Sequence, residues 1–376
     1  MKPFEKILVR GVNWLGDAVM TTPALRRLRE AQPQAHITLL TPAKLAGLWQ
    51  HHPGVDSVLT LAEDESVFQL SRRLRAEQFQ AAVLFPNSPR AALESWLARI
   101  PERIGLAQPW RDFFLTRVIE RPPDQVRMRK RPIAEIKRLI AAPTAPAAGI
   151  PASAHHLHHY LRVVAALGAT TQPVPPFLAV TEEEVAAIQQ RFAGPASGGV
   201  GTPLFGLNAG AEYGPAKRWP RERFVEAAIV LHRRTGCRWW VLGGKADQEL
   251  ASAITTGIQN AAGVGPGAAR NLAGATSLRE LCAALKACDL LLTNDSGPMH
   301  VAAAVGTPVV APFGSTSPEL TGPGLPGEGR HRVLRSQAPC APCFRRKCPI
   351  DLRCLTGIDV EMVVNAALEA AGGKGG

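Results

Sequence analysis

Short apolar runs alternate with amphipathic stretches along this 376-residue chain, and the alternation starts again near its middle. Apolar runs of about four to eight residues between polar turns are typical of buried strands, and strands that alternate with helices are typical of parallel sheets flanked by helices. The pattern therefore predicts the α/β class. The expected strands are residues 6–10, 36–40, 55–61 and 81–85 in the first half, and residues 204–210, 237–244, 289–293 and 308–314 in the second.

The restart of the pattern predicts two doubly wound, Rossmann-like domains. A stretch rich in glycine and proline, residues 194–203, separates the halves and favours a loop or hinge. We expect a first domain over residues 1–195 and a second over residues 204–345. Residues 346–376 would then form a cysteine-containing segment and a C-terminal helix that packs back toward the first domain. Two such domains carry their binding loops at the carboxyl ends of the strands, so we expect them to face one central cleft.

A polar turn separates the expected strand 289–293 from a helix that begins near Met299. The turn contains Asp295, Ser296 and Gly297. The start of a helix leaves unpaired N–H groups and a partial positive charge, and a glycine lets a phosphate approach the backbone. We therefore predict that Ser296 and Gly297 contact a phosphate. Asp295 would repel a phosphate and is expected to accept hydrogen bonds from sugar hydroxyls; an ordinary strand-to-helix turn with a capping side chain is the alternative.

The loop after the first expected strand carries Asp17 at the start of a helix. The helix dipole stabilises a carboxylate there. Asp17 is the candidate general base, which would take a proton from an attacking hydroxyl, and a helix-terminal charge without chemistry is the alternative. The loop lacks the glycine fingerprint of dinucleotide-binding enzymes, and no acidic residue follows at the spacing for ribose recognition. A nicotinamide enzyme is thus disfavoured.

Charged residues also follow the expected strands of the second half. Lys217 lies in the loop after residues 204–210, where a lysine could neutralise a departing diphosphate without a metal ion. A solvated basic pair is the alternative, and it is the preferred interpretation for the neighbouring Arg218. Asp247 follows the next strand and is a candidate contact for a ribose or a base. These side chains are all expected at one edge of the second domain.

Three segments are specific when they are taken in order: NWLGDAVMTTPAL, GAEYGPAKRWP and NDSGPMHVAAAVGTPVVAPFGSTSPE. Together they resemble glycosyltransferase family 9, the lipopolysaccharide heptosyltransferases, and most closely its heptosyltransferase II subgroup. The resemblance extends from residue 6 to about residue 365. It implies the two-domain GT-B architecture. It also implies an inverting transfer of L-glycero-D-manno-heptose from ADP-heptose to heptosyl-Kdo2-lipid A of the lipopolysaccharide inner core, with no required cofactor.

The resemblance further implies roles for individual residues. Asp17 becomes the catalytic base, Lys217 the diphosphate contact and the 296–297 turn the phosphate site. Asp295 contacts a heptose hydroxyl, and His300, one helical turn further on, supports the turn. The implied partners are a nucleotide-sugar donor and an anionic glycolipid acceptor.

Four cysteines lie close together near the end of the chain. In a chain expected in the cytoplasm, such a cluster favours zinc or an iron–sulfur centre over disulfides. The spacings of two, four and five residues between successive cysteines are not those of standard paired zinc knuckles. A free-thiol loop is the preferred interpretation, structural zinc stays an open alternative, and no metal ligand is assigned. The resemblance places a similar cluster in the heptosyltransferase II subgroup. The four are Cys340, Cys343, Cys348 and Cys354.

A formal net charge of +12 and a pI near 9.8 favour an anionic partner. Arg127, Arg129 and Lys130, in the basic run 117–132, are candidate contacts for phosphate or Kdo carboxylates of the acceptor, or for the anionic face of the membrane. A solvated surface is the alternative. The first residues predict neither a signal peptide nor a membrane span. We therefore expect a cytoplasmic protein that is peripheral at the inner face of the inner membrane.

Three other functions stay open. The chain would fit a heptosyltransferase I-type enzyme or another GT-B transferase that uses a different nucleotide sugar. A zinc-containing nucleic-acid-binding protein would fit the charge and the cysteines, but the basic residues are dispersed without an aromatic-rich stripe, so no nucleic acid is expected. A catalytically silent module would bind the sugar nucleotide without turnover.

Overall fold

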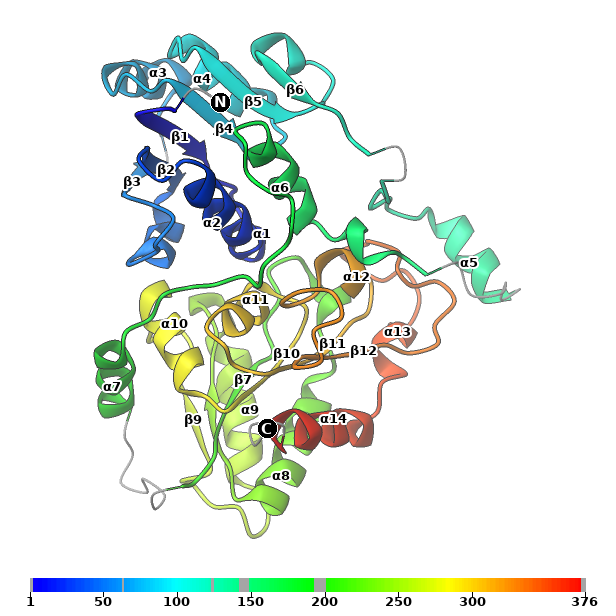
Figure 1. Ribbon diagram of the computed structural model, residues 1–376. Helices are drawn as coiled ribbons and strands as arrows, with labels where there is room; N and C mark the ends of the chain where they lie inside the picture. Colours follow the sequence, from blue (N-terminus) through cyan, green and yellow to red (C-terminus); the bar gives the residue numbers. More distant parts are fainter. Residues whose placement is uncertain (1–2, 63, 123–124, 142–148, 193–200, 373–376) are drawn as a thin grey trace. The chain divides into compact units, whose positions relative to one another are not determined.

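The computed structural model describes residues 3–62, 64–122, 125–141, 149–192 and 201–372 (Figure 1). The chain divides into two compact units. The first comprises Met1–Val126 and Ser153–Ala179, and the second comprises Arg127–Ala152 and Val180–Gly376. Each unit is built on one six-stranded parallel sheet.

The sheet of the first unit is covered by helices on both faces. Its elements are β1 (Lys6–Arg10), α1 (Leu15–Met20), α2 (Thr22–Ala31), β2 (His36–Pro42), η1 (Ala43–Trp49), β3 (Ser57–Leu61), α3 (Val67–Ala76), β4 (Ala81–Leu84), α4 (Pro89–Leu97), β5 (Glu102–Leu106), η2 (Asp112–Phe114), β6 (Arg117–Ile119) and α6 (Leu157–Ala165), with η3 (Ala152–Ala154) where the unit resumes. Helices α3 and α4 pack on one face, against Leu8, Leu40 and Leu84. Because successive strand residues point to opposite faces, Ile7 and Val9 face the other side, where α2 and α6 contact each other.

The second unit repeats this arrangement with a larger core. Its elements are α5 (Ile133–Ala141), α7 (Glu182–Arg191), β7 (Leu204–Asn208), η4 (Pro215–Lys217), α8 (Arg221–Thr235), β8 (Arg238–Val241), η5 (Lys245–Asp247), α9 (Gln248–Gln259), β9 (Ala269–Asn271), α10 (Leu278–Ala287), β10 (Leu290–Thr293), α11 (Gly297–Ala304), β11 (Val309–Pro312), α12 (Pro318–Thr321), β12 (Arg332–Leu334), α13 (Arg353–Thr356) and α14 (Val360–Gly372). Helices α8, α9 and α14 pack on Leu207, Trp239 and Leu292, while α10 and α11 contact each other.

Both sheets have the same strand order. It runs β3-β2-β1-β4-β5-β6 in the first unit and, read from its other edge, β9-β8-β7-β10-β11-β12 in the second. The order reverses between β1 and β4 and between β7 and β10, and in doubly wound sheets ligands bind beyond the carboxyl ends of the strands at this switch point. In the second sheet Asn208 pairs in register with Thr293, so the loops after β7 and β10 start side by side.

All eight strands expected from the sequence are present, and four more were not expected. Strands β6, β9 and β12 have only three residues and contain arginine, and β5 begins with two charged residues, so none carries a clear apolar pattern. The amphipathic stretch 18–31 does not form one continuous helix. Its first part ends at Met20 and a second helix begins at Thr22, where Pro23 occupies the first turn and cannot donate a backbone hydrogen bond to the preceding turn.

The compact units differ from the domain ranges expected from the sequence. Residues 127–152 group with the second unit, where the N–H of Arg131 donates to the carbonyl of Cys343 at 3.0 Å and Ile136 packs on Cys340 and Cys343. Helix α7 also belongs to the second unit, because Glu184 pairs with Arg279 on α10. The boundary therefore falls at residue 180, and residues 194–200 of the expected hinge lie outside the described residues.

The C-terminal helix α14 lies in the core of the second unit, whereas the sequence predicted that residues 346–376 return toward the first. Val363, Val364 and Ala367 are buried in the cluster that contains Leu290 and Val310. An apolar helix face must pack on another element to be buried. Helix α14 packs beside α8 and against strands β10, β11 and β12.

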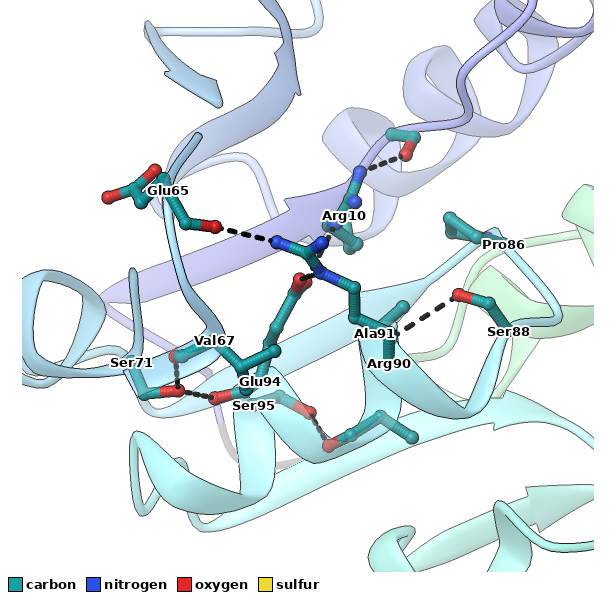
Figure 2. A network of polar contacts seen from close by, with 12 residues as sticks. Arg10, Glu65, Val67, Ser71, Pro86, Ser88, Arg90, Ala91, Glu94 and Ser95 are labelled. Carbon is teal, nitrogen blue, oxygen red and sulfur yellow. Dashed lines mark hydrogen bonds and ion pairs between the residues drawn. The ribbon is translucent and has the colours of Figure 1, made fainter. Parts of the chain in front are cut away.

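A buried ion pair fixes the end of β1 (Figure 2). Nε of Arg10 donates to Glu94 at 3.2 Å, and Nη1 donates to the carbonyl of Gly11 at 2.7 Å. Glu94 on α4 is 1% exposed and also accepts from Nε of Arg90 at 2.8 Å. Burial lowers the pKa of Arg10, and the charge of Glu94 opposes that shift. The pair ties α4 to the start of the loop that carries Asp17.

Replacing Glu94 with glutamine is expected to lower the free energy of unfolding by about 3–5 kcal/mol, because the buried Arg10 cation loses its carboxylate. Urea unfolding followed by circular dichroism measures the change. Glu30→Gln is the matched control, since Glu30 pairs with Arg26 and Arg27 on the surface and should cost at most about 1 kcal/mol. If both variants lost the same free energy of unfolding, the buried pair would stabilise the fold no more than the surface pair does.

Candidate active site

Two asparagines connect the loops at the switch point of the second sheet. Asn294, which is fully buried, donates from Nδ2 to the carbonyl of Ala209 at 2.7 Å and accepts at Oδ1 from the N–H of Trp219 at 2.9 Å. Asn208 accepts at Oδ1 from the N–H of Gly210 at 3.1 Å. One side chain on the β10 loop therefore holds both the β7 loop and the segment that leads into α8.

Lys217 and Asp295 form an ion pair at this switch point. Nζ of Lys217 lies 2.6 Å from Oδ2 of Asp295, and the hydroxyl of Thr316 donates to the same oxygen at 2.5 Å. The Asp295 side chain is 4% exposed and that of Lys217 is 13% exposed. A buried carboxylate therefore orders the lysine. The sequence analysis placed both residues at this edge but did not predict that they contact each other.

Tyr213 connects this pair to the cysteine-containing segment. Two cations lie near its ring, with Nζ of Lys217 at 4.9 Å from the ring centroid and the guanidinium carbon of Arg346 at 5.2 Å. The Tyr213 hydroxyl donates to the carbonyl of Phe344 at 2.8 Å, and the N–H of Ala216 donates to the carbonyl of Arg346 at 3.0 Å. Two positive charges are thus held beside one aromatic ring. The sequence did not predict that Tyr213 or Arg346 belongs to this site, because the two residues are far apart in the chain and contact each other only in the folded unit.

The predicted phosphate turn forms the N-terminus of α11. Ser296 is the N-cap residue and Gly297 the first helical residue. Within the part of the chain that the structure describes, the Ser296 side chain makes no capping bond to the helix; its Oγ lies 3.3 Å from Oγ of Thr293. The amide groups of the first turn therefore keep their capacity to bind an anion. His300 is 5% exposed on the same helix, consistent with a supporting position below the turn.

Asp247 lies at the same sheet edge as β7 and β8. It accepts at Oδ2 from the N–H of Gly244 at 3.0 Å. It also lies directly over Gly210, where a Cβ atom would come within 2.7 Å of Oδ1. Glycine at position 210 is what allows this approach. Arg218, in contrast, turns back to donate to the carbonyl of Ala211 at 3.3 Å.

In the first unit, Asp17 lies in the first turn of α1, directly beyond the carboxyl end of β1. Its charge acts on Tyr160 of α6: burial and then the Asp17 carboxylate raise the pKa of that phenol well above its usual value of 10. The Tyr160 ring also packs edge-on against Phe85 at 5.2 Å. The half-buried Asp17 carboxylate therefore lies at a helix N-terminus and close enough to Tyr160 for its charge to act on that phenol.

Two histidines at the start of α6, His156 and His159, are partly buried. Burial, followed by the charges of neighbouring groups, lowers the pKa of His156 and His159 to about 4. The His159 ring nitrogen Nε2 lies 3.2 Å from the amide of Gln125. These rings are consequently neutral near pH 7.

The candidate acceptor contacts Arg127, Arg129 and Lys130 are exposed. Arg129 forms an ion pair with Glu135 at 2.7 Å. All three fall in the second compact unit, not in the first as the domain ranges implied.

The four cysteines surround one small pocket, which Ile136, Ala216 and Ser315 also line. All four are free thiols, and only Cys348 is partly exposed. Burial, followed by the neighbouring cysteines, raises the pKa of Cys354 to about 12, so this thiol stays protonated near neutral pH. Among the described residues, no group of three or more His, Cys, Asp or Glu side chains is arranged to hold a metal ion.

Solved structures share this fold. Escherichia coli ADP-heptose LPS heptosyltransferase II has a TM-score of 0.75 and 26% identity, with 99% of this chain and 100% of that chain covered. A glycosyl transferase of family 9 from Veillonella parvula has a TM-score of 0.77 over 99% and 98% of the two chains and, at 24% identity, supports the fold alone. The paired doubly wound sheets define a glycosyltransferase of the GT-B class.

Sequence comparison then identifies the family within this class of glycosyltransferases. The pattern of glycosyltransferase family 9 (heptosyltransferase) matches residues 67–353. Lipopolysaccharide heptosyltransferase 2 of Salmonella typhimurium is 31% identical over 327 residues, which cover 85% of either chain. The chain belongs to glycosyltransferase family 9.

Proposed function

We propose that the chain transfers L-glycero-D-manno-heptose from ADP-heptose to heptosyl-Kdo2-lipid A in the inner core of lipopolysaccharide. The observation that carries the proposal is the buried Lys217–Asp295 pair beside the N-terminus of α11, at the switch point of a sheet. The names of the family relatives, lipopolysaccharide heptosyltransferase 2 and ADP-heptose LPS heptosyltransferase II, support the choice of sugar and acceptor.

The second unit is the proposed donor site. Lys217 neutralises charge on the diphosphate as it departs, and the amides of the 296–297 turn hold a phosphate oxygen. Asp295, which already orients Lys217, accepts a hydrogen bond from a heptose hydroxyl. Asp247 contacts the ribose or the base.

The chemistry is a single displacement with inversion. The acceptor oxygen forms a bond with the anomeric carbon as the bond from that carbon to the β-phosphate oxygen breaks, and the electron pair leaves with ADP. Asp17 takes the proton of the acceptor hydroxyl. One carboxylate suffices, because the leaving diphosphate needs no proton to depart and Lys217 supplies a positive charge. The proposal therefore requires no metal cofactor.

The acceptor is an anionic glycolipid, so we place the enzyme at the inner face of the inner membrane as a peripheral protein. Arg127, Arg129 and Lys130 are the proposed contacts for the acceptor's phosphate and carboxylate groups. Across the described residues, none of the helices combines the length and the apolar character needed to cross a bilayer.

The test is ADP release by the purified chain with ADP-heptose and heptosyl-Kdo2-lipid A, alongside a reaction without acceptor. We expect release that depends on the acceptor, with a product heavier by one heptose in mass spectrometry. A family relative named heptosyltransferase 1, from Pseudomonas aeruginosa, is 35% identical over 133 residues, so Kdo2-lipid A is the second acceptor to try. Activity with Kdo2-lipid A alone would reassign the acceptor, and donor binding without turnover on either acceptor would leave only a binding module.

A further inference from the structure

The loop between β5 and β6 exposes large aromatic rings. Trp110 is 90% exposed and Phe113 is 82% exposed, the two highest values for large apolar side chains among the described residues. The Phe113 ring contacts Phe114 at 5.5 Å between centroids, and Phe114 contacts Trp96 of α4 at 5.6 Å. We call Trp96, Trp110, Phe113 and Phe114 the aromatic patch. Water contacts most of its outer surface, which is unfavourable for rings of this size.

The backbone holds the outer rings in this exposed position. Arg111, between the two, is fully buried and donates from Nη1 to the carbonyl of Pro86 at 2.6 Å, which ties the loop to the end of β4. Asp112 accepts from the N–H of Gln108 at 2.9 Å and closes the turn.

Trp110 itself has a φ of +67°, a left-handed conformation that is uncommon for a bulky residue. Burial of Arg111 and the closed turn hold Trp110 in this conformation. A strained residue that projects an apolar ring into water points to a partner for that ring.

The charge around the patch identifies the kind of partner. Arg99, three residues after Trp96, and Arg117, three residues after Phe114, are exposed, and the whole chain carries a net charge of +12. Aromatic rings flanked by cations suit the interface of a bilayer with anionic headgroups, where tryptophan is favoured and each nearby cation adds attraction. The proposed acceptor is itself anchored in a membrane by lipid A, and this step rests on the proposed function. The patch is also in the unit that carries Asp17.

We propose that the aromatic patch docks the enzyme on an anionic bilayer by inserting Trp110 and Phe113 into the headgroup region. Docking would confine the enzyme to the surface on which its lipid-anchored acceptor diffuses. The patch would raise the encounter rate with acceptor without taking part in the chemistry.

The test compares the double variant W110S/F113S with the unaltered chain. Flotation with vesicles of phosphatidylethanolamine and phosphatidylglycerol measures binding, and heptosyl transfer is assayed with vesicle-embedded acceptor and with its deacylated, water-soluble form. We expect vesicle affinity and the rate on embedded acceptor to fall at least about tenfold, because two large apolar contacts are lost. Transfer to the soluble acceptor should stay within about twofold of the unaltered rate, which also shows that the variant is folded.

F68S is the matched control, because Phe68 on α3 is 76% exposed but is not in the patch. It should leave vesicle binding unchanged. Unaltered vesicle binding by W110S/F113S, or an equal loss in F68S, would overturn the docking proposal. If the unaltered chain transfers heptose to neither acceptor, the proposed function fails, while the flotation result still decides the role of the patch.

Discussion

Replacing Asp17 with asparagine is expected to lower kcat by roughly 10²- to 10⁴-fold while binding of ADP-heptose is retained. The amide has nearly the shape of the carboxylate but cannot accept the acceptor's proton. The proposed donor contacts lie in the other compact unit, so the affinity for ADP-heptose should change little. Single-turnover transfer measures the chemical step, and calorimetric titration with ADP-heptose measures donor binding.

The control for Asp17 must remove an acidic charge from a helix start without removing a base. Glu222→Gln does this, because Glu222 lies exposed in the first turn of α8. We expect it to leave kcat within about twofold. If Asp17→Asn behaved like Glu222→Gln, Asp17 would be only a helix-terminal charge.

Replacing Lys217 with methionine is expected to have two separable effects. Transfer should fall by roughly 10²- to 10³-fold, because the departing diphosphate loses a preorganised positive charge. The free energy of unfolding should fall by about 3–5 kcal/mol, because the Asp295 carboxylate stays buried without its cation.

The double variant K217M/D295N separates these effects. Its neutral amide can still accept the Thr316 hydroxyl bond and needs no counter-charge, so most of the stability should return. Activity should not return, since the lysine is still absent. Lys137→Met, at an exposed position of α5, controls for the loss of a surface lysine. Recovery of transfer in the double variant would mean that Lys217 matters only as a partner for Asp295.

The sequence predicted most inner strands and one edge strand, β3, but missed the inner strand β5 and the edge strands β6, β9 and β12. Inner strands are buried on both faces and read as continuous apolar runs, such as LLLT of β10. Strands as short as RVI and ARN carry no such run. The domain boundary was also misplaced, because the sequence gives no sign that residues 127–152 pair with the segment around Cys343.

The candidate site was predictable in position and not in detail. The rule that polar residues after parallel strands gather at one sheet edge located Lys217, Asp247 and Asp295. Thr316 follows β11 and was available to the same reasoning, but its hydroxyl pairs with Asp295 only in three dimensions. Arg346 had no local signal, because its contact with Tyr213 joins residues more than a hundred positions apart.

The bonds of Asn294 also limit when the proposed donor site can form during synthesis. This side chain joins Ala209 and Trp219, which leave the ribosome long before residue 294 does. Until β10 pairs with β7, the segment 209–219 lacks its hydrogen bonds to Asn294, and Lys217 lacks its ion pair with Asp295. The carbonyls of Phe344 and Arg346 that hold Tyr213 and Ala216 arrive later still. The proposed donor site can therefore assemble only after residue 346 has been synthesised, long after the strands of the first sheet have left the ribosome.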